Sequence, residues 1–92
     1  MSVTVRIPAP LRPLTQNLAE VVLEEARTVG AAVEELERKY PGLRSRLLDD
    51  KGALRRYINI FRNEQDIRAA SVLATELSAG DKLTIVPAIA GG

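Results

Sequence analysis

The fold is decided by the last stretch of the chain, residues 80–92, which reads GDKLTIVPAIAGG. A turn at residues 79–81 precedes an apolar run over 83–86, in which Leu83 and Ile85 alternate with Thr84 and Val86, and this predicts a final strand. Pro87 has no backbone N–H and therefore ends the hydrogen-bonding ladder of that strand. The residues after it reach roughly 17 Å when fully extended, at about 3.4 Å each. We expect them to form an extended tail, residues 88–92, that can enter a cleft in another protein.

The composition of this tail differs from that of an ordinary disordered chain end, which is charged or hydrophilic. Gly91 and Gly92 have no side chain that would keep a partner's backbone away from a terminal carboxylate. A carboxylate used as a chemical handle fits this design, and Ile89 offers a large apolar side chain as a docking anchor. Two plainer explanations stay open: the natural chain continues beyond Gly92, or Ile89 folds back on the body. The residues predicted to contact a partner in this tail are Pro87, Ala88, Ile89, Ala90 and Gly91.

Length and composition limit what the chain can do. Its 92 residues make one small domain, residues 1–92, with little room for an enclosed active site. It contains neither cysteine nor histidine, which removes the usual thiol nucleophile, the near-neutral general base and the common nitrogen and sulfur metal ligands. We therefore expect no enzyme activity of its own and no metal site. No apolar run approaches the roughly 20 residues that span a bilayer, and the start alternates like a strand rather than a signal peptide, so we expect a cytoplasmic protein.

Alternation, capping and turn signals predict the remaining elements. Apolar residues at spacings of three and four, after a Thr28 cap, predict a helix that ends before Pro41-Gly42. Strands are predicted over residues 3–7, 18–23, 57–62, 66–68 and 83–86, with a turn at Asn63-Glu64 between the third and the fourth. On the outer face of the helix, oppositely charged residues four apart are predicted to pair, Glu34 with Arg38 and Glu35 with Lys39.

This order of elements predicts an α+β domain, in which a mixed sheet of four to five strands packs its apolar face on one main helix. A right-handed crossover through the helix allows the last strand to lie parallel to the first. That arrangement is the ubiquitin-like β-grasp. The alternative is a ferredoxin-like split βαβ fold, which needs a second full helix near residues 69–79, and that stretch is short for one.

Positive charge gathers in the middle of the chain. The net charge of the whole chain is +1, but residues 38–68 hold nine basic and four acidic side chains. Such a region suits an acidic partner or a phosphate-bearing molecule, or is simply a solvated face. Nucleic acid is disfavoured, because its binding proteins usually add stacking aromatics and a larger net charge. The basic residues considered for this patch are Arg44, Arg46, Lys51, Arg55, Arg56, Arg62 and Arg68.

The final stretch resembles the tails of the bacterial sulfur carriers of the ThiS and MoaD family, relatives of ubiquitin. The shared pattern is GD, an apolar strand, a proline, and A-x-A-G-G. The likeness runs over the whole chain and is strongest to the CysO-type branch of the family, which feeds sulfide into cysteine synthesis. The stretches that carry this closer likeness are VTVRIP at 3–8, LRP at 11–13, INI at 58–60 and DIR at 66–68.

The resemblance implies a chemistry for Gly92. In the family, the C-terminal carboxylate is adenylated by an activating enzyme resembling MoeB or ThiF, which uses ATP and Mg²⁺, and is then converted to a thiocarboxylate. The carrier binds no cofactor itself. In the CysO-type branch, the sulfur attacks an aminoacrylate formed from O-phosphoserine on a CysM-like pyridoxal-phosphate synthase, and a zinc peptidase of the JAMM type then releases cysteine.

Other functions remain open for a chain with this fold and this C-terminal tail. A molybdopterin-synthase small subunit would use the same Gly92 thiocarboxylate while docked on a MoaE-like large subunit. The thiamine carriers are usually shorter and lack the arginine-rich connection between Pro41 and Tyr57. A ubiquitin-like modifier would attach Gly92 to target lysines. A plain β-grasp interaction module would instead bind through sheet residues such as Tyr57 and Phe61, although aromatic residues on a strand more often serve packing.

Overall fold

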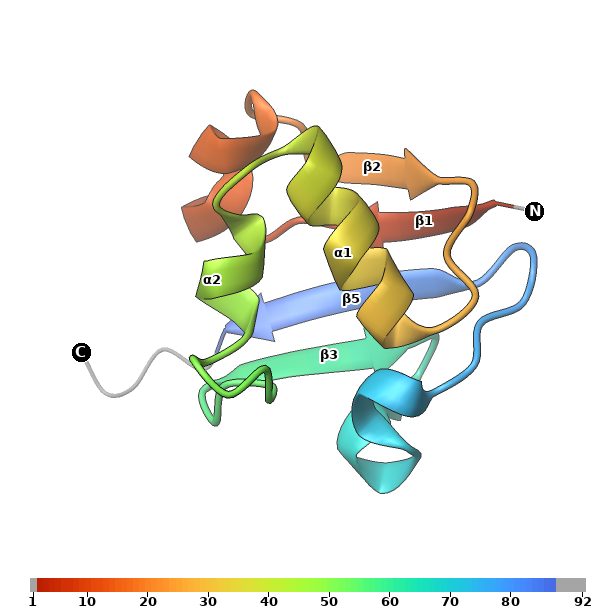
Figure 1. Cartoon of the computed structure of the whole chain (residues 1–92). Coiled ribbons are helices and arrows are strands. Elements are labelled where there is room, and N and C mark those ends of the chain that lie inside the picture. The colour runs from red at the N-terminus through yellow and green to blue at the C-terminus, as the bar shows by residue number, and fades with distance from the viewer. Residues whose placement is uncertain (1, 88–92) are drawn as a thin grey trace.

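The computed structural model describes residues 2–87. Five strands form one sheet in the order β2-β1-β5-β3-β4, and Figure 1 shows α1 and α2 lying on the same face of it. The strands are β1 (Val3–Arg6), β2 (Glu20–Leu23), β3 (Ile58–Arg62), β4 (Gln65–Asp66) and β5 (Lys82–Pro87). The helices are α1 (Val29–Lys39), α2 (Leu43–Leu47) and three 3₁₀ helices, η1 (Ala9–Thr15), η2 (Ile67–Ala69) and η3 (Val72–Ala74). The predicted β-grasp architecture is confirmed.

The last strand lies in the middle of the sheet. Strand β5 runs parallel to β1, with Val5 opposite Leu83, and antiparallel to β3, with Ile60 opposite Ile85. Strand β2 pairs antiparallel with β1 at one edge, and the short β4 pairs with β3 at the other. The parallel arrangement of first and last strands, expected from the sequence, is therefore present.

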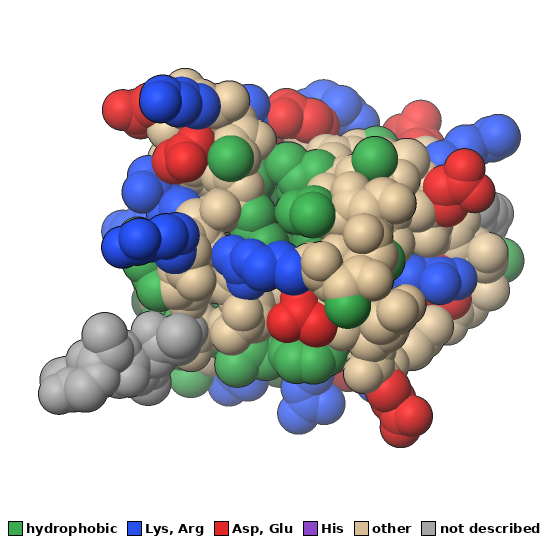
Figure 2. Space-filling model, turned by 90° about the horizontal axis from the view of Figure 1, so that it is seen from below, with side chains coloured by type: hydrophobic (Ala, Val, Ile, Leu, Met, Phe, Trp, Pro, Cys, Tyr) green, Lys and Arg blue, Asp and Glu red, His purple; other side chains and the backbone are tan. Residues whose placement is uncertain are grey.

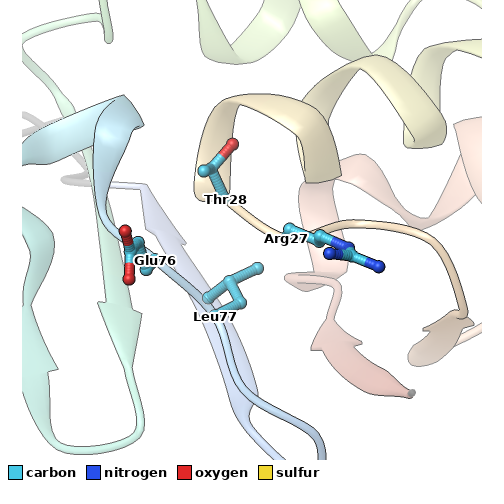
Figure 3. Close-up of a pocket in the computed structure, with 4 residues that line it drawn as sticks. All are labelled: Arg27, Thr28, Glu76 and Leu77. Atoms are coloured by element: carbon cyan, nitrogen blue, oxygen red, sulfur yellow. The ribbon is translucent and has the colours of Figure 1, made fainter.

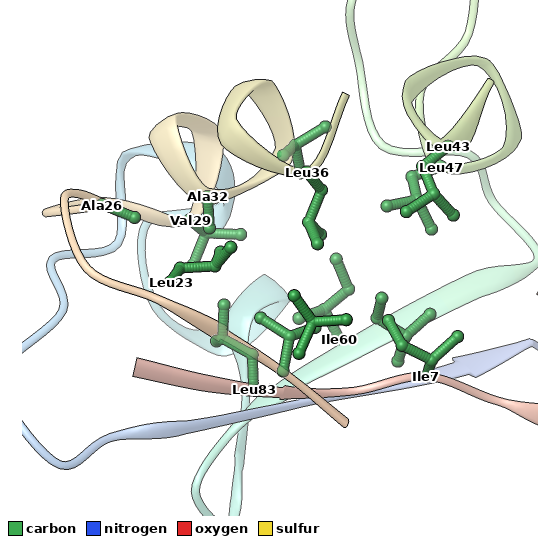
Figure 4. Packing of buried hydrophobic residues seen from close by; sticks show 14 of the residues in the cluster. Ile7, Leu23, Ala26, Val29, Ala32, Leu36, Leu43, Leu47, Ile60 and Leu83 are labelled. Carbon is green, nitrogen blue, oxygen red and sulfur yellow. The ribbon is translucent and has the colours of Figure 1, made fainter. Parts of the chain in front are cut away.

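The core lies between the sheet and the helices, as Figure 4 shows. Alternate strand residues such as Val5, Ile60 and Leu83 point into it and are nearly inaccessible to solvent. Leu36 from α1 and Leu47 from α2 pack against them from above. Burial of this set is the main favourable term in folding, because apolar surface leaves water.

Helix α1 forms where the sequence predicts it. The side-chain oxygen of Thr28 accepts a hydrogen bond from the N–H of Ala31 at 3.1 Å, which satisfies one of the donors left unpaired at a helix start. Val29, Val33 and Leu36 are buried at the expected helical spacing. The helix ends at Lys39, with Tyr40 as its C-cap residue, just before Pro41-Gly42, where the sequence predicts its end.

The charge pairs predicted for the outer face of α1 are wrong. Glu35 is only 4% exposed, and its carboxylate accepts from the N–H groups of Glu24 and Glu25 at 3.3 and 3.4 Å. Glu34 pairs instead with Arg44 of α2, at 2.7 Å. Tertiary partners replace the four-residue pairs because each such pair stabilises a helix by only about 0.2–0.5 kcal/mol.

Two other segments differ from the sequence-based expectation. The predicted strand over residues 18–23 begins two residues later, at Glu20, because the N–H of Leu18 bonds back to the carbonyl of Thr15. The predicted strand over residues 66–68 is cut short, because the Asp66 side chain accepts from the N–H of Arg68 and starts η2. Within residues 2–87, the stretch between β4 and β5 holds only the two short 3₁₀ helices, so the ferredoxin-like alternative is excluded. Of the helices described here, none is both long and apolar enough to cross a membrane.

Candidate functional site

The described part of the chain ends at the end of the sheet, at Pro87. Pro87 lies opposite Ile58, the first residue of β3. Tyr57, directly before Ile58, is 51% exposed. Among the predicted site residues, Pro87 and Tyr57 are thus brought to the same end of the sheet. The predicted tail residues Ala88, Ile89, Ala90, Gly91 and Gly92 lie outside the described residues.

Phe61, the second aromatic of the candidate partner surface, lies elsewhere. It is half-buried in β3, opposite Thr84 of β5 on one side and Asp66 of β4 on the other. Its neighbour Ile60 points into the core, so Phe61 lies on the sheet face that the helices leave open. The exposed Val86 is also on this face, at 39% exposure. Tyr57 thus sits just before β3 at the end of the sheet, and Phe61 lies within β3 on the open face.

A shallow hollow of about 350 Å³ adjoins Tyr57. It is lined by Asp49, Arg55, Arg56 and Tyr57, which come from the connection between α2 and β3. Because Tyr57 directly precedes the residue opposite Pro87, the hollow lies near Pro87, where the described part of the chain ends.

Asp49 holds the first half of this connection in a tight turn. Its carboxylate accepts from the N–H of Lys51 at 2.9 Å and from the N–H of Ala53 at 3.0 Å, and Gly52 takes the positive φ that the turn needs. The hydrogen bond from Ala53, opposed by partial desolvation and helped by Lys51 and Arg55, lowers the pKa of the Asp49 carboxyl below its usual value. The neighbouring Asp50 is exposed, whereas Asp49 has a structural role.

Arg68 holds the second half of the connection, a role that no sequence pattern indicated. Its Nη1 donates to the carbonyl of Ile58 and to the side-chain oxygen of Asn59, both at 2.8 Å. Its Nη2 donates to the carbonyl of Arg55 at 2.7 Å. One guanidinium thus ties η2 to the segment that faces Pro87, using the forked donor geometry that distinguishes arginine.

The predicted basic patch divides into two groups. Three of its members already have partners: Arg44 pairs with Glu34, Arg62 pairs with Asp81 at 2.7 Å, and Arg68 is bound as described. The remaining members have no carboxylate within ion-pair distance among residues 2–87, and they all belong to α2 or the connection after it. They are Arg46, Lys51, Arg55 and Arg56.

The GD pair of the tail pattern has a structural role at the opposite end of β5. Gly80 adopts a φ of +88° and donates its N–H to the carbonyl of Ser2 at 2.8 Å. The Asp81 carboxylate accepts from Arg62, from the side chain of Asn63 and from the N–H of Ser78. Burial alone would raise the pKa of Asp81, but these donors outweigh it and lower the pKa. The GD pair anchors the start of the strand that carries the tail.

A second hollow, of about 370 Å³, lies away from the tail. Figure 3 shows it between Arg27 and Thr28, before α1, and Glu76 and Leu77, before β5. These two segments are joined by backbone hydrogen bonds, including Leu77 N–H to the Arg27 carbonyl at 2.8 Å. No group of three or more potential metal ligands occurs anywhere in residues 2–87.

Comparison with known proteins places this geometry in a family. The model of the ThiS family matches residues 5–92. The chain is 44% identical to the sulfur carrier protein CysO of Mycobacterium tuberculosis over the full length of both proteins. It is also 33% identical to small archaeal modifier protein 3 of Haloferax volcanii, over 76% of this chain and 75% of that one.

Solved structures agree with the sequence relatives. The crystal structure of the Amycolatopsis orientalis BexX/CysO complex matches with a TM-score of 0.90 and 38% identity, over 98% of this chain and 99% of that one. The crystal structure of M. tuberculosis CysO matches with a TM-score of 0.88 and 42% identity, over 95% and 99%. The family match, the end-to-end likeness to a sulfur carrier and the shared β-grasp together show that the chain belongs to the ThiS family, as a homologue of CysO: a small carrier and not an enzyme.

Proposed function

We propose that Gly92 is the sulfur-bearing residue and that the chain donates sulfide for cysteine synthesis. The observation that carries the proposal is the position of Pro87: β5 delivers it to an exposed end of the sheet, and the residues that follow it end in two glycines. The full-length likeness to CysO favours the cysteine branch over the molybdopterin and thiamine branches.

The first step of the proposed chemistry activates the carboxylate. A carboxylate oxygen is a poor leaving group, so the Gly92 carboxylate first attacks the α-phosphorus of ATP and displaces pyrophosphate. The MoeB- or ThiF-like partner supplies the Mg²⁺ and the cationic groups that offset the charge which accumulates on the phosphates. Sulfide then attacks the acyl carbon and displaces AMP, which leaves a thiocarboxylate on Gly92.

The second step transfers the sulfur. The thiocarboxylate sulfur adds to the aminoacrylate that a CysM-like enzyme forms from O-phosphoserine with loss of phosphate. The acyl group then moves from sulfur to the amino nitrogen, which joins Gly92 to cysteine through an amide bond. Hydrolysis of that bond by a JAMM-type zinc peptidase releases cysteine and restores the Gly92 carboxylate.

Reconstitution tests this proposal. The chain is incubated with ATP, Mg²⁺, sulfide and its MoeB-like enzyme, and the intact mass is measured. We expect the mass to rise by the difference between sulfur and oxygen, and we expect no change in a variant that lacks Gly92. Addition of the CysM-like enzyme and O-phosphoserine then converts the product to the cysteine adduct. A thiocarboxylate that reacts only with a molybdopterin precursor on a MoaE-like subunit would contradict the cysteine assignment.

Conjugation to proteins is the second candidate. Two curated relatives, 33% and 38% identical, are named small archaeal modifier proteins, and they cover 76% and 71% of this chain. The same adenylate can be captured by a lysine amine in place of sulfide. Mass spectrometry of tryptic peptides from host proteins would then find lysines linked to the C-terminal Gly-Gly.

A further inference from the structure

Four cations of the predicted basic patch have no carboxylate partner among residues 2–87, and they lie in α2 and in the connection that leads to β3. Figure 2 shows several Lys and Arg side chains at its left end, which is the end at which β5 finishes in Figure 1, and others around the rest of this face. Arg56 lines the hollow beside Tyr57 and is exposed, as are Lys51 and Arg46. Arg55 donates its Nε to the carbonyl of Ser45 at 3.0 Å, so its position is fixed while its charge stays unpaired among residues 2–87. We call these four residues together with Tyr57 the exit face.

The exit face must lie close to any protein that holds Gly92. The tail spans roughly 17 Å at most, at about 3.4 Å per residue. A protein that binds the end of the tail in a cleft therefore brings the rim of that cleft near Pro87. Ile58 lies opposite Pro87, so Tyr57 and Arg56, directly before it, are among the described residues nearest to this rim.

Contacts within the chain already order the backbone of the exit face. The turn around Asp49 fixes Lys51, and Arg68 binds the carbonyls of Arg55 and Ile58. Neither of these contacts uses the side-chain charge of Lys51 or Arg56. A surface that is ordered in advance loses less side-chain and loop entropy on binding.

The chemistry of the exit face fits a carboxylate-bearing protein surface better than a small phosphate. Asp49 lines the same hollow as Arg55 and Arg56, and its carboxylate, like that of any aspartate with an ordinary or lowered pKa, is ionised at neutral pH. A phosphate group in the hollow would meet this negative charge. On the surface of a partner protein, by contrast, separate carboxylates can each approach a different cation of the exit face. Tyr57 would add apolar contact area.

We propose that the exit face, made of Arg46, Lys51, Arg55, Arg56 and Tyr57, docks an acidic surface around the tail-accepting cleft of the enzyme that activates the chain. This inference rests on the proposed adenylation of Gly92. Complementary charge of this kind mainly accelerates association and selects the partner, since rim charges act on the encounter of the two proteins.

Charge reversal at Arg56 tests the inference, with Arg27→Glu as the matched control. Arg56 and Arg27 are both exposed arginines whose side chains make no hydrogen bond or ion pair within the described residues, and Arg27 lies at the second hollow, away from the tail. Both substitutions change the net charge equally. The measurement is ATP–pyrophosphate exchange by the MoeB-like enzyme, with the carrier concentration varied at several salt concentrations.

We expect Arg56→Glu to raise the KM for the carrier about ten-fold or more relative to Arg27→Glu, with kcat unchanged. At about 1 M salt, where the Debye length is roughly 3 Å, the two variants should converge. Lys51→Glu is expected to act in the same direction as Arg56→Glu. Equal KM values for Arg56→Glu and Arg27→Glu would overturn the inference, and so would an effect on the KM for ATP in place of the carrier, which would indicate phosphate binding. Absence of exchange with the unchanged chain would instead refute the proposed adenylation.

Discussion

Pro87 at the end of β5 lies opposite Ile58 at the start of β3, and this pairing fixes the point at which the described part of the chain ends. Strand β5 is central, between β1 and β3, so its position is held by partners on both sides. Pro87 is therefore held at a well-supported point, while the connection that ends in Tyr57 forms the surface next to it. The predictions below test the contacts that support this arrangement and the tail itself.

Removal of the Arg68 side chain should loosen the connection beside Pro87. Arg68→Ala deletes hydrogen bonds to the carbonyls of Ile58 and Arg55, and because Arg68 is exposed we expect a loss of about 1 kcal/mol in the free energy of unfolding. For a domain of this size, each kcal/mol lowers Tm by about 4–8 °C. Thermal unfolding of both chains measures this decrease in Tm. Arg56→Ala is the control, with an expected change within about 0.5 kcal/mol, and equal Tm values for the two variants would contradict the role given to Arg68.

The buried carboxylate of Glu35 should contribute more to the free energy of unfolding than the exposed carboxylate of Glu34. Glu35→Ala leaves the N–H groups of Glu24 and Glu25 without their acceptor, which should lower the free energy of unfolding by about 1–3 kcal/mol. Glu34→Ala removes only a solvent-exposed pair with Arg44 and should cost about 0.5 kcal/mol or less. Urea denaturation of both variants measures the difference. A reversed order would show that Glu35 lies on the solvent face, as the helical spacing alone suggests.

Acid should destabilise the protein partly through Asp81. The pKa of Asp81 is lower in the folded chain than in the unfolded one, where an aspartate has a pKa of about 3.9. Its contribution is therefore fully present above the unfolded pKa and is lost as the pH falls through the folded pKa. Asp81→Asn should reduce stability at neutral pH and flatten the acid limb of the stability curve. Chemical denaturation across this pH range measures both effects, and an unchanged acid limb in the variant would argue against them.

The tail should need its apolar side chain for activation. Ile89→Asp is expected to slow adenylation by the MoeB-like enzyme, because an aspartate cannot replace the apolar contact of Ile89 in the partner's cleft. The fold should be unaffected, which circular dichroism can check. Ala88→Ser is a milder change in the same tail and serves as the control. If Ile89→Asp is adenylated as fast as the unchanged chain, Ile89 is not an anchor.

The sequence predicts the elements whose signals are local. Alternation in β1, β3 and β5 and the Thr28 cap of α1 can each be recognised within a few neighbouring residues, and all of them are present in the structure. The same signals predict the parallel neighbours β1 and β5, because one helix connects the two halves of the sheet.

Contacts between distant residues could not be predicted in this way. Arg68 binds the carbonyl of Arg55, 13 residues away, and Glu35 binds the N–H of Glu24, 11 residues away. Both residues look like ordinary surface charges in the sequence. Likewise, the charge count indicated a basic region, but only the structure separates the paired Arg44, Arg62 and Arg68 from the cations at the exit face.

The most direct test of the central claim is the intact mass of the protein purified gently from its native host. We predict a population in which one oxygen of Gly92 is replaced by sulfur, and we predict that this population disappears when Gly92 is deleted. A chain that continues beyond Gly92 in every molecule would contradict the account, because no free carboxylate would then be available for adenylation.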